Sequence, residues 1–383
     1  MPASLWLLAL LFLAVASGFL LGRLDRLRVP RRRRIRPTHL PLRLGEPADQ
    51  ALRTMLDNLD CSPEEIDTPL ALGRLYRKRG ELDRATLIHQ RMLDNKHLPE
   101  SVREDVELEL ALDFLAAGLL DRAEQVLQQT VDRGGRHAPA AMRHLMSIFE
   151  QERDWHSALA MGERLLRRQG DIAPVLAQYC CELAERLLEH EPKAARRLLR
   201  RALALDGQCV RASLLQGQLE IRTGQWENAL RALRRIRRQN PAFLDQALDD
   251  LERCYQALGR EDDMLSFLLE ACLTAPSSLL VVKLAQVLRE RAGAQEATLF
   301  LAQYMKQVPS LQGLHEIVEM NLGQAGGSTR EHLDTLHQLT RQLLARRTAF
   351  QCSQCGFSAQ ALHWQCPGCK HWATIAPAPS TVV

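Results

Sequence analysis

The sequence predicts an all-α fold, a superhelix of stacked helix pairs with an apolar helix at its N-terminus and a small cysteine-rich β module at its C-terminus. Three observations predict it: a repeat of about 34 residues, an uncharged apolar run at the start of the chain, and two CxxC pairs near its end. The 383 residues are 46% hydrophobic but only 5% aromatic, a composition that suits helices built on leucine and alanine.

The repeat is clearest in residues 70–93, which read as two short helices joined by a turn at Gly80. Gly73 and Ala85 are small where the two helices would cross. Residues equivalent to Ala85 recur at intervals of 33 to 38 residues: Ala51, Ala123, Ala158, Ala195, Ala229, Met264 and Ala297. This period predicts a tetratricopeptide-repeat array over residues 48–310, followed by capping helices over 311–347. The alternative is an ordinary irregular helical domain.

Residues 1–22 carry no charged side chain and would be about 33 Å long as a helix, enough to cross a bilayer. Residues 23–36 then hold eight arginines and one acid. Positive charge beside a span stays on the cytoplasmic side, so we expect a single-pass anchor with its N-terminus outside and the bulk of the chain in the cytoplasm. A cleaved signal peptide is the alternative, because Ala14–Ala16 has a small-x-small pattern. Residues 23–47 form a basic, proline-rich linker.

The net charge is +4, but the arginine run contributes +7, which leaves about −3 for the remainder. That remainder is a mixed-charge surface, and it excludes a broad nucleic-acid-binding face. The arginine run itself has two interpretations: attraction to anionic headgroups beside the anchor, or binding of a nucleic acid or an effector.

The second CxxC pair follows the first after ten residues, and together they supply Cys352, Cys355, Cys366 and Cys369. Four thiolates on two such turns suit one metal ion per chain, iron or zinc, in a tetrathiolate site. A filled coordination sphere makes the site structural or electron-transferring. The module spans residues 348–375, and residues 376–383 read as a disordered tail. The bulky side chains beside the site, Trp364, His371 and Trp372, are candidates for binding a partner.

The chain shows no phosphate-binding glycine loop, HExxH or GxSxG motif, so we predict that it is not an enzyme. Glu150 and Glu152 lie on an expected helical face, where we expect both carboxylates to be solvated. The six remaining cysteines are scattered without the spacing of a disulfide scaffold, which indicates a reducing compartment.

The whole combination resembles the lipopolysaccharide assembly protein B (LapB) family of Gram-negative bacteria. The likeness is carried by LGRLYRKRGELDRATLIHQRML (72–93), AAGLLDRAE (116–124), YCCELA (179–184) and CSQCGF with HWQCPGCKHWATI (352–357 and 363–375). It implies a rubredoxin-like module in which the four cysteines are the ligands. It also implies an inner-membrane adaptor that regulates lipopolysaccharide (lipid A) synthesis, with an FtsH-type membrane protease and the committed-step deacetylase of that pathway as partners.

Two departures qualify this likeness. Lys370 stands where rubredoxins carry glycine, and the ten-residue spacer is far shorter than theirs, which favours docking over electron transfer. Prolines in residues 29–47 also replace most of the first repeat. A rubredoxin-like electron-transfer protein on a membrane-bound scaffold is the alternative function, and a nucleic-acid-binding zinc ribbon is a third. The oligomeric state stays open, with a homo-oligomer as one expectation.

Overall fold

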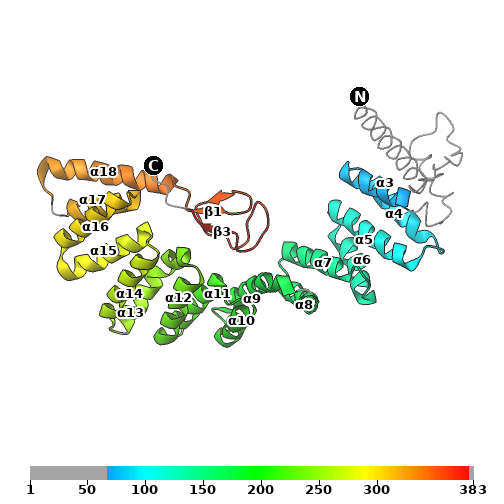
Figure 1. The fold of residues 1–383 in the computed structure, drawn as a ribbon, viewed down its shortest axis with the longest axis horizontal. Coiled ribbons are helices and arrows are strands. Elements are labelled where there is room, and N and C mark those ends of the chain that lie inside the picture. Colours follow the sequence, from blue (N-terminus) through cyan, green and yellow to red (C-terminus); the bar gives the residue numbers. More distant parts are fainter. Residues whose placement is uncertain (1–66, 169, 324, 379–383) are drawn as a thin grey trace, which may run out of the picture. The chain divides into compact units, whose positions relative to one another are not determined.

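A computed structural model describes residues 67–168, 170–323 and 325–378 (Figure 1). The predicted anchor over residues 1–22, the linker over 23–47 and the start of the array lie outside the described residues. Within the described part, no helix combines the length and the apolar character needed to cross a membrane. The chain divides into two compact units, Met1–Pro99 and Glu100–Val383, and each is described by itself.

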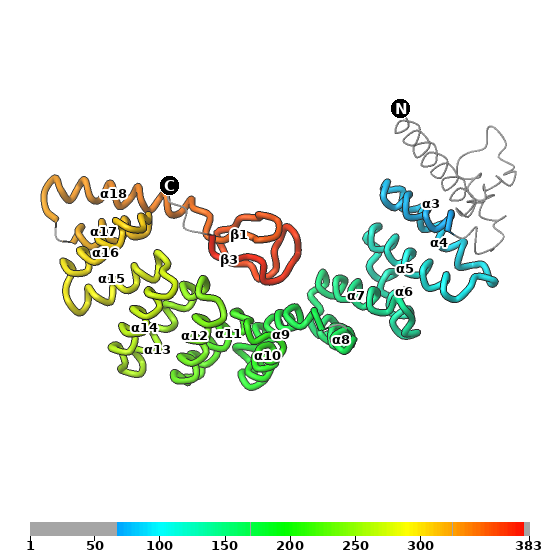
Figure 2. The backbone as a smooth tube through the Cα atoms, viewed as in Figure 1, coloured from blue at the N-terminus to red at the C-terminus, as the bar shows by residue number. Residues whose placement is uncertain are grey.

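Most of the described residues are helical (Figure 2). The first unit contributes α3 (Asp67–Lys78) and α4 (Leu82–Asp94). The second contributes α5 (Glu100–Ala116), α6 (Leu120–Arg133), α7 (Ala138–Glu152), α8 (Trp155–Leu166), α9 (Ala173–Leu187), α10 (Pro192–Leu205), α11 (Val210–Arg222), α12 (Trp226–Gln239), α13 (Leu248–Ala257), α14 (Glu261–Thr274), α15 (Ser278–Ala292), α16 (Ala294–Gln307), α17 (Leu311–Leu322) and α18 (Gly327–Arg346), with 3₁₀ segments η1 (Gly170–Ile172) and η2 (Pro241–Ala247). Odd-numbered helices are the first of each pair, and even-numbered helices the second.

The predicted repeat register is confirmed by burial. The recurring small residues fall on second helices and are fully buried: Ala85, Ala123, Ala158, Ala195, Ala229 and Ala297 are each 0% exposed, and Met264 is 3% exposed. Ala51 lies outside the described residues. The turn glycines Gly80, Gly118, Gly224 and Gly259 all have φ between 63 and 81°, the left-handed region that glycine enters without a steric penalty. The result is a tetratricopeptide-repeat superhelix, as predicted.

Close helix approach explains the second set of small residues. A Cβ atom built on Gly217 of α11 would lie 2.4 Å from Cδ2 of Leu233 on α12. Leu233 is itself fully buried, so the glycine leaves the space that the leucine fills. The small residue at this position therefore sets the distance between the two helices of a pair.

One joint of the array departs from the regular turn. Pro241 follows α12 and begins η2, and the Asn240 side chain accepts a hydrogen bond from the N–H of Ala242 over 3.1 Å. Phe243, Leu244 and Ala247 of η2 are buried in the core that α11 to α15 share. This segment matters for the site, because the last strand of the chain packs against it.

The C-terminal module is a three-stranded antiparallel sheet in the order β2-β1-β3. Its strands are β1 (Phe350–Cys352), β2 (Ser358–Ala359) and β3 (Ile375–Pro377). In the register, Phe350 pairs with Ala359 on one side and Pro377 on the other. The expected tail over residues 376–383 is therefore wrong at its start, because backbone pairing with β1 holds Ala376 and Pro377 in the sheet.

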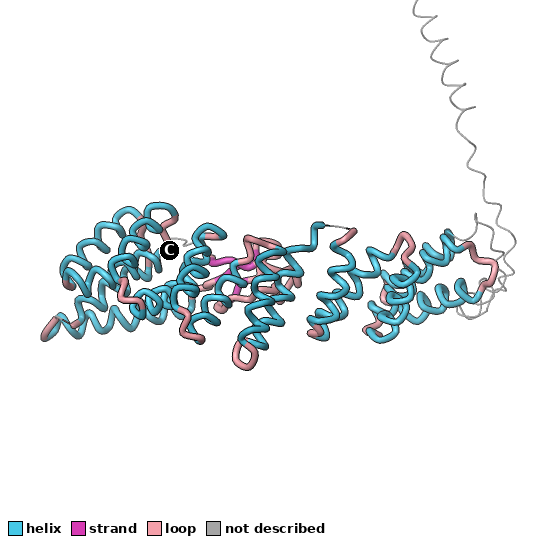
Figure 3. Tube along the Cα trace, turned by 90° about the horizontal axis from the view of Figure 1, so that it is seen from below, coloured by secondary structure: helices cyan, strands magenta, loops and turns pink. Residues whose placement is uncertain are grey.

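The module follows α18 in sequence but lies against helices from the middle of its unit (Figures 1 and 3). Leu362, Trp364 and Ala376 pack on the hydrophobic core that includes Phe243 and Leu244 of η2. The module also has a small core of its own, formed by Phe350, Cys352, Cys366 and Ile375. Its position therefore depends on contacts with the array as well as on its own fold.

Candidate metal centre and its docking site

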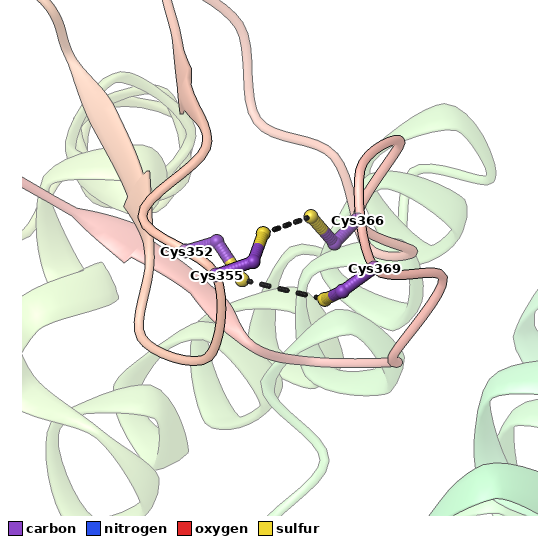
Figure 4. A group of neighbouring side chains, drawn as sticks. All are labelled: Cys352, Cys355, Cys366 and Cys369. Carbon is purple, nitrogen blue, oxygen red and sulfur yellow. Dashed lines mark hydrogen bonds between the residues drawn. The ribbon is translucent and has the colours of Figure 1, made fainter.

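The structure brings together the four cysteines of the two CxxC pairs (Figure 4). All four sulfurs lie within 4.8 Å of one another. The Sγ atoms of Cys352 and Cys369 are 3.8 Å apart, and those of Cys355 and Cys366 are 3.6 Å apart. Four sulfurs placed tetrahedrally at about 2.3 Å from a zinc ion would be about 3.8 Å from one another. The arrangement thus fits a metal of this size.

The local backbone explains why each pair of sulfurs points inward. In the first turn, the N–H of Gly356 donates to the carbonyl of Cys352 over 3.1 Å, and Gly356 has a φ of 75°. The N–H of Gln354 points at Cys352 Sγ over 3.4 Å. In the second turn, the N–H of Lys370 donates to the carbonyl of Cys366 over 2.9 Å. The first and third of these bonds close the turns, and the Gln354 amide directed at Cys352 Sγ favours the thiolate form of that cysteine.

Lys370 occupies the position where the sequence departs from rubredoxins. Its φ is 61°, so the chain keeps here the left-handed conformation that glycine adopts readily. Gly368, two residues earlier, lies close to the other pair: a Cβ atom there would be 3.4 Å from Cys355 Sγ, in van der Waals contact. In both turns, therefore, the residue after the second cysteine is left-handed, with a φ of 75° at Gly356 and 61° at Lys370.

The two thiols of the first CxxC pair have pKa values shifted in opposite directions. Cys352 Sγ and the Thr374 hydroxyl are hydrogen-bonded over 3.3 Å, and this bond, together with backbone amides of the same turn, lowers the pKa of the Cys352 thiol to about 6. The N–H of Phe357 lowers the pKa of Cys355, but burial and the neighbouring thiols outweigh it and raise the pKa to about 11. Thiolates are the form that binds metal, and soft thiolates suit zinc or iron. The donor set fits either ion and leaves no position for a substrate.

One carboxylate of the array accepts hydrogen bonds from the module. Glu150, near the end of α7, accepts a hydrogen bond from Trp372 Nε1 over 2.9 Å and one from Gln365 Nε2 over 3.2 Å. It also accepts one from the hydroxyl of Tyr179 on α9. Burial, followed by the charge of Glu150, raises the pKa of Tyr179, so the phenol stays protonated and can donate. The expectation that Glu150 is solvated was wrong, because three donors converge on it.

Aromatic packing surrounds this carboxylate. The ring of Trp372 lies edge-on to Trp155, with 5.8 Å between centroids, and edge-on to Tyr179, with 5.9 Å. Such edge-to-face pairs are each worth about 0.5–1.5 kcal/mol beyond the area that they bury. Glu152, two residues from Glu150 on the same helix, is exposed, as we expected. Glu150 is thus part of a contact inside the molecule, whereas Glu152 faces solvent.

A second contact lies at the other tryptophan. Trp364 stacks on Phe243 of η2 with 5.8 Å between centroids and 17° between ring planes. The guanidinium of Arg211, on α11, lies over the same indole at 5.9 Å. Arg211 is held in place by Glu182 and Glu185 of α9, at 2.8 and 2.6 Å. The two tryptophans therefore dock the module at two points, on α7 to α9 and on α11 to η2.

The structure places the three side chains that were predicted to bind a partner. Trp364 and Trp372 are half-buried against the array, a role inside the molecule that the sequence analysis missed. His371 is exposed, with Nδ1 3.0 Å from the carbonyl oxygen of Cys369. Binding of a partner by the three stays a prediction. The array residues that receive the module carry no local motif, so no sequence signal could have paired them with it.

A second group with metal-binding side chains lies between α17 and α18: His315, Glu319 and His337. The two imidazoles stack face to face, with 4.5 Å between centroids and 21° between planes. His315 Nδ1 is bonded to Thr340 over 2.8 Å. Stacked rings direct their nitrogen lone pairs along parallel planes and not toward one point, so this group suits an ion less well than the four cysteines do.

Comparison with known families matches both parts of the chain. A rubredoxin metal-binding domain matches residues 350–377, and a tetratricopeptide repeat matches residues 70–103. Lipopolysaccharide assembly protein B of Haemophilus influenzae is 30% identical over 346 residues, which cover 87% of each chain. The protein of the same name from Escherichia coli K12 is 29% identical over 337 residues, covering 87% of this chain and 86% of that one.

Two solved structures of tetratricopeptide repeats show a distant likeness to this chain. A tetratricopeptide repeat protein from Parabacteroides merdae is 14% identical, with a TM-score of 0.33, and the match covers 72% of this chain and 98% of that one. The TPR2AB domain of yeast Sti1, solved as a complex with pHSP90, is also 14% identical, with a TM-score of 0.36, and the match covers 73% of this chain and 100% of that one. Likenesses of this size say nothing about what the chain does.

Proposed function

This chain belongs to the lipopolysaccharide assembly protein B family, and we propose that it is a membrane-tethered adaptor that regulates lipopolysaccharide synthesis. Residues 1–22 anchor it in the bacterial inner membrane, and the array and metal module act in the cytoplasm. The chain contributes surfaces and no catalytic group of its own. The proposal rests on family membership for the pathway and on the docked module for the mode of action.

The observation that carries the mode of action is the attachment of the module to the array through Glu150. Four cysteines would close the coordination sphere of the metal, so the ion would hold the fold and would bind no substrate. A module of this size owes much of its folding free energy to its metal. Because the folded module packs on α7, α9, α11 and η2, the metal also organises a composite surface made of module and array.

We place the partners on this composite surface. By resemblance to the family, they are an FtsH-type membrane protease and the deacetylase that commits carbon to lipid A. The adaptor would present the deacetylase to the protease and so set the rate of lipopolysaccharide synthesis. His371 lies on the exposed side of the module, and Trp364 and Trp372 fix the orientation of that side. We propose that the protein acts in this way, through partner-binding surfaces held near the membrane and without a reacting group.

The test replaces Cys366 and Cys369 with serine in cells that lack the wild-type copy. We expect the deacetylase to accumulate as it does without the protein, because the module unfolds and the composite surface is lost. Cys272→Ala is the control, because this half-buried thiol lies outside the module and alanine adds no polar group beside the core. Deacetylase levels are followed by immunoblot after protein synthesis is stopped. Normal turnover in the double serine variant would refute the proposal.

The colour and redox behaviour of the purified protein, compared with deacetylase turnover, separate an adaptor from an electron-transfer protein. Purified protein loaded with zinc is colourless and redox-inert, whereas a ferric tetrathiolate is coloured and bleaches on reduction. If deacetylase turnover requires iron and follows the redox state of the intact site, the rubredoxin-like alternative replaces the adaptor.

A further inference from the structure

A groove rich in arginine lies on a different part of the array from the docked module. It has a volume of about 960 Å³ and is lined mainly by the second helices α10 and α12, with Phe267 of α14 at one wall. Seven arginines line it, against a single carboxylate, that of Glu220. Outside the N-terminal arginine run the chain has a net charge of about −3, so this density of positive charge is a local feature.

The carboxylates nearby do not neutralise the groove. Glu220 is 2% exposed and already accepts two hydrogen bonds from Arg196, at 2.7 and 2.8 Å. Arg237 is paired with Glu270 over 2.9 Å. Five further arginines line the groove without an ion pair to any carboxylate that the structure describes: Arg200, Arg231, Arg234, Arg235 and Arg238.

Several of these guanidinium groups are held in position before any ligand arrives. Arg234 and Arg237 lie over the ring of Phe267, at 5.4 and 5.5 Å from its centroid. Arg235 is half-buried and donates to Gln216 over 2.7 Å, while its Nε atom has no partner. Stacking and hydrogen bonding fix the planes of these groups, so little side-chain entropy remains to be lost on binding.

The spacing of the arginines indicates a ligand with more than one anionic group. Arg231, Arg234, Arg235 and Arg238 stand at i, i+3, i+4 and i+7 on α12, so they share one face of the helix. This stripe is about 10 Å long at 1.5 Å per residue, more than one phosphate can contact. Arg200 of α10 adds a further positive group to the lining of the same groove.

We propose that this groove binds a ligand carrying two or more phosphate groups, either a free polyphosphorylated small molecule or a phosphorylated lipid headgroup. Guanidinium forks match phosphate oxygens in bidentate geometry. A groove of this volume has the size of a small-molecule site. The half-buried Arg235, which has only a neutral partner, needs an anion compact enough to reach it, and phosphate is compact. The proposal goes beyond the adaptor role and does not depend on it.

The test measures binding of inorganic triphosphate to the full-length protein by isothermal titration calorimetry. Because residues 23–36 also attract anions, Arg31 to Arg34 are changed to glutamine in every protein tested. In that background, Arg231→Gln with Arg238→Gln should weaken triphosphate binding by on the order of tenfold or more, since charge-assisted hydrogen bonds are lost. Arg167→Gln with Arg253→Gln removes the same charge at exposed sites outside the groove and should leave affinity unchanged.

Both double variants should be folded by circular dichroism, because all four substitutions are at exposed positions. Vesicles containing phosphatidic acid, compared with neutral vesicles, distinguish a lipid headgroup from a free ligand. The proposal is overturned if triphosphate does not bind, or if both double variants weaken binding equally, which would show a response to net charge alone. It is also overturned if poly-glutamate binds the groove and triphosphate does not, since the partner is then an acidic polypeptide.

Discussion

Trp372 donates its indole N–H to Oε1 of Glu150 over 2.9 Å, which joins the metal module to a helix 222 residues earlier in the chain. The same carboxylate receives Gln365 of the module and Tyr179 of the array. A single side chain of α7 therefore satisfies polar groups on both sides of the contact. The stacking of Trp364 on Phe243 is a second contact between the module and the array.

The first prediction concerns this carboxylate. Glu150→Ala should destabilise the docked state by about 1–3 kcal/mol, because it leaves the indole N–H of Trp372 and the buried hydroxyl of Tyr179 without an acceptor. Hydrogen exchange followed by mass spectrometry should show faster exchange in residues 350–377 and little change in α13 to α16. Glu152→Ala removes the same group from an exposed position and should change neither. Equal exchange in the two variants would contradict the docking role of Glu150.

The second prediction concerns the metal. Cys366→Ser with Cys369→Ser should reduce metal content from one ion per chain to none and unfold the module, while far-UV circular dichroism shows the helices intact. The melting temperature of the array should also fall, because Phe243 and Tyr179 lose the tryptophans that cover them. Trp372→Ala should keep the metal while weakening docking. Retention of one ion by the double serine variant would mean that the remaining cysteines suffice.

The third prediction tests helix packing. Gly217→Ala should cost about 1–3 kcal/mol in the free energy of unfolding, because its Cβ atom would meet the buried Leu233 at 2.4 Å. Gly323→Ala is the matched control, since a Cβ atom there meets nothing within 4 Å and its φ is −68°. That variant should be neutral or slightly stabilised. The measurement is urea unfolding of both variants, followed by circular dichroism. Equal midpoints would show that Leu233 moves aside without a loss of stability.

The fourth prediction tests the repeat register. Ala229→Arg should destabilise the array by about 3 kcal/mol or more, because it forces a long charged side chain into a fully buried contact. Ala257→Arg makes the same change at an exposed position in the last turn of α13, where positive charge is favourable. Its unfolding midpoint should match that of the wild type. A similar loss at both positions would point to a general effect of charge.

The fifth prediction concerns the residues before the described part. A reporter fused after Val383 should be active in the cytoplasm, and Met1–Gly22 should be retained in the mature protein. The uncharged run followed by eight arginines is the reason. Intact mass measurement of the membrane-extracted protein checks retention. A mature N-terminus at Ser17, or reporter activity in the periplasm, would show that the run is a signal peptide.

The sequence by itself determined the features that repeat or that lie close together along the chain. The 34-residue period located Ala229 and its equivalents in the core, because small residues are required wherever two helices of a pair cross. The turn glycines followed from the left-handed backbone that a short connection needs. The CxxC spacing identified the four sulfurs, because each pair sits on one tight turn and the two turns are only ten residues apart.

Only the tertiary structure decided where the module lies and what it contacts. Trp372 meets Glu150, and Trp364 meets Phe243, through contacts between segments that are far apart in the chain. Ala376 joins the sheet through backbone pairing. Local periodicity carries no information about such contacts, so Glu150 and Glu152 looked alike in sequence. The arginine groove has the same origin, because α10 and α12 come together only when neighbouring repeats stack.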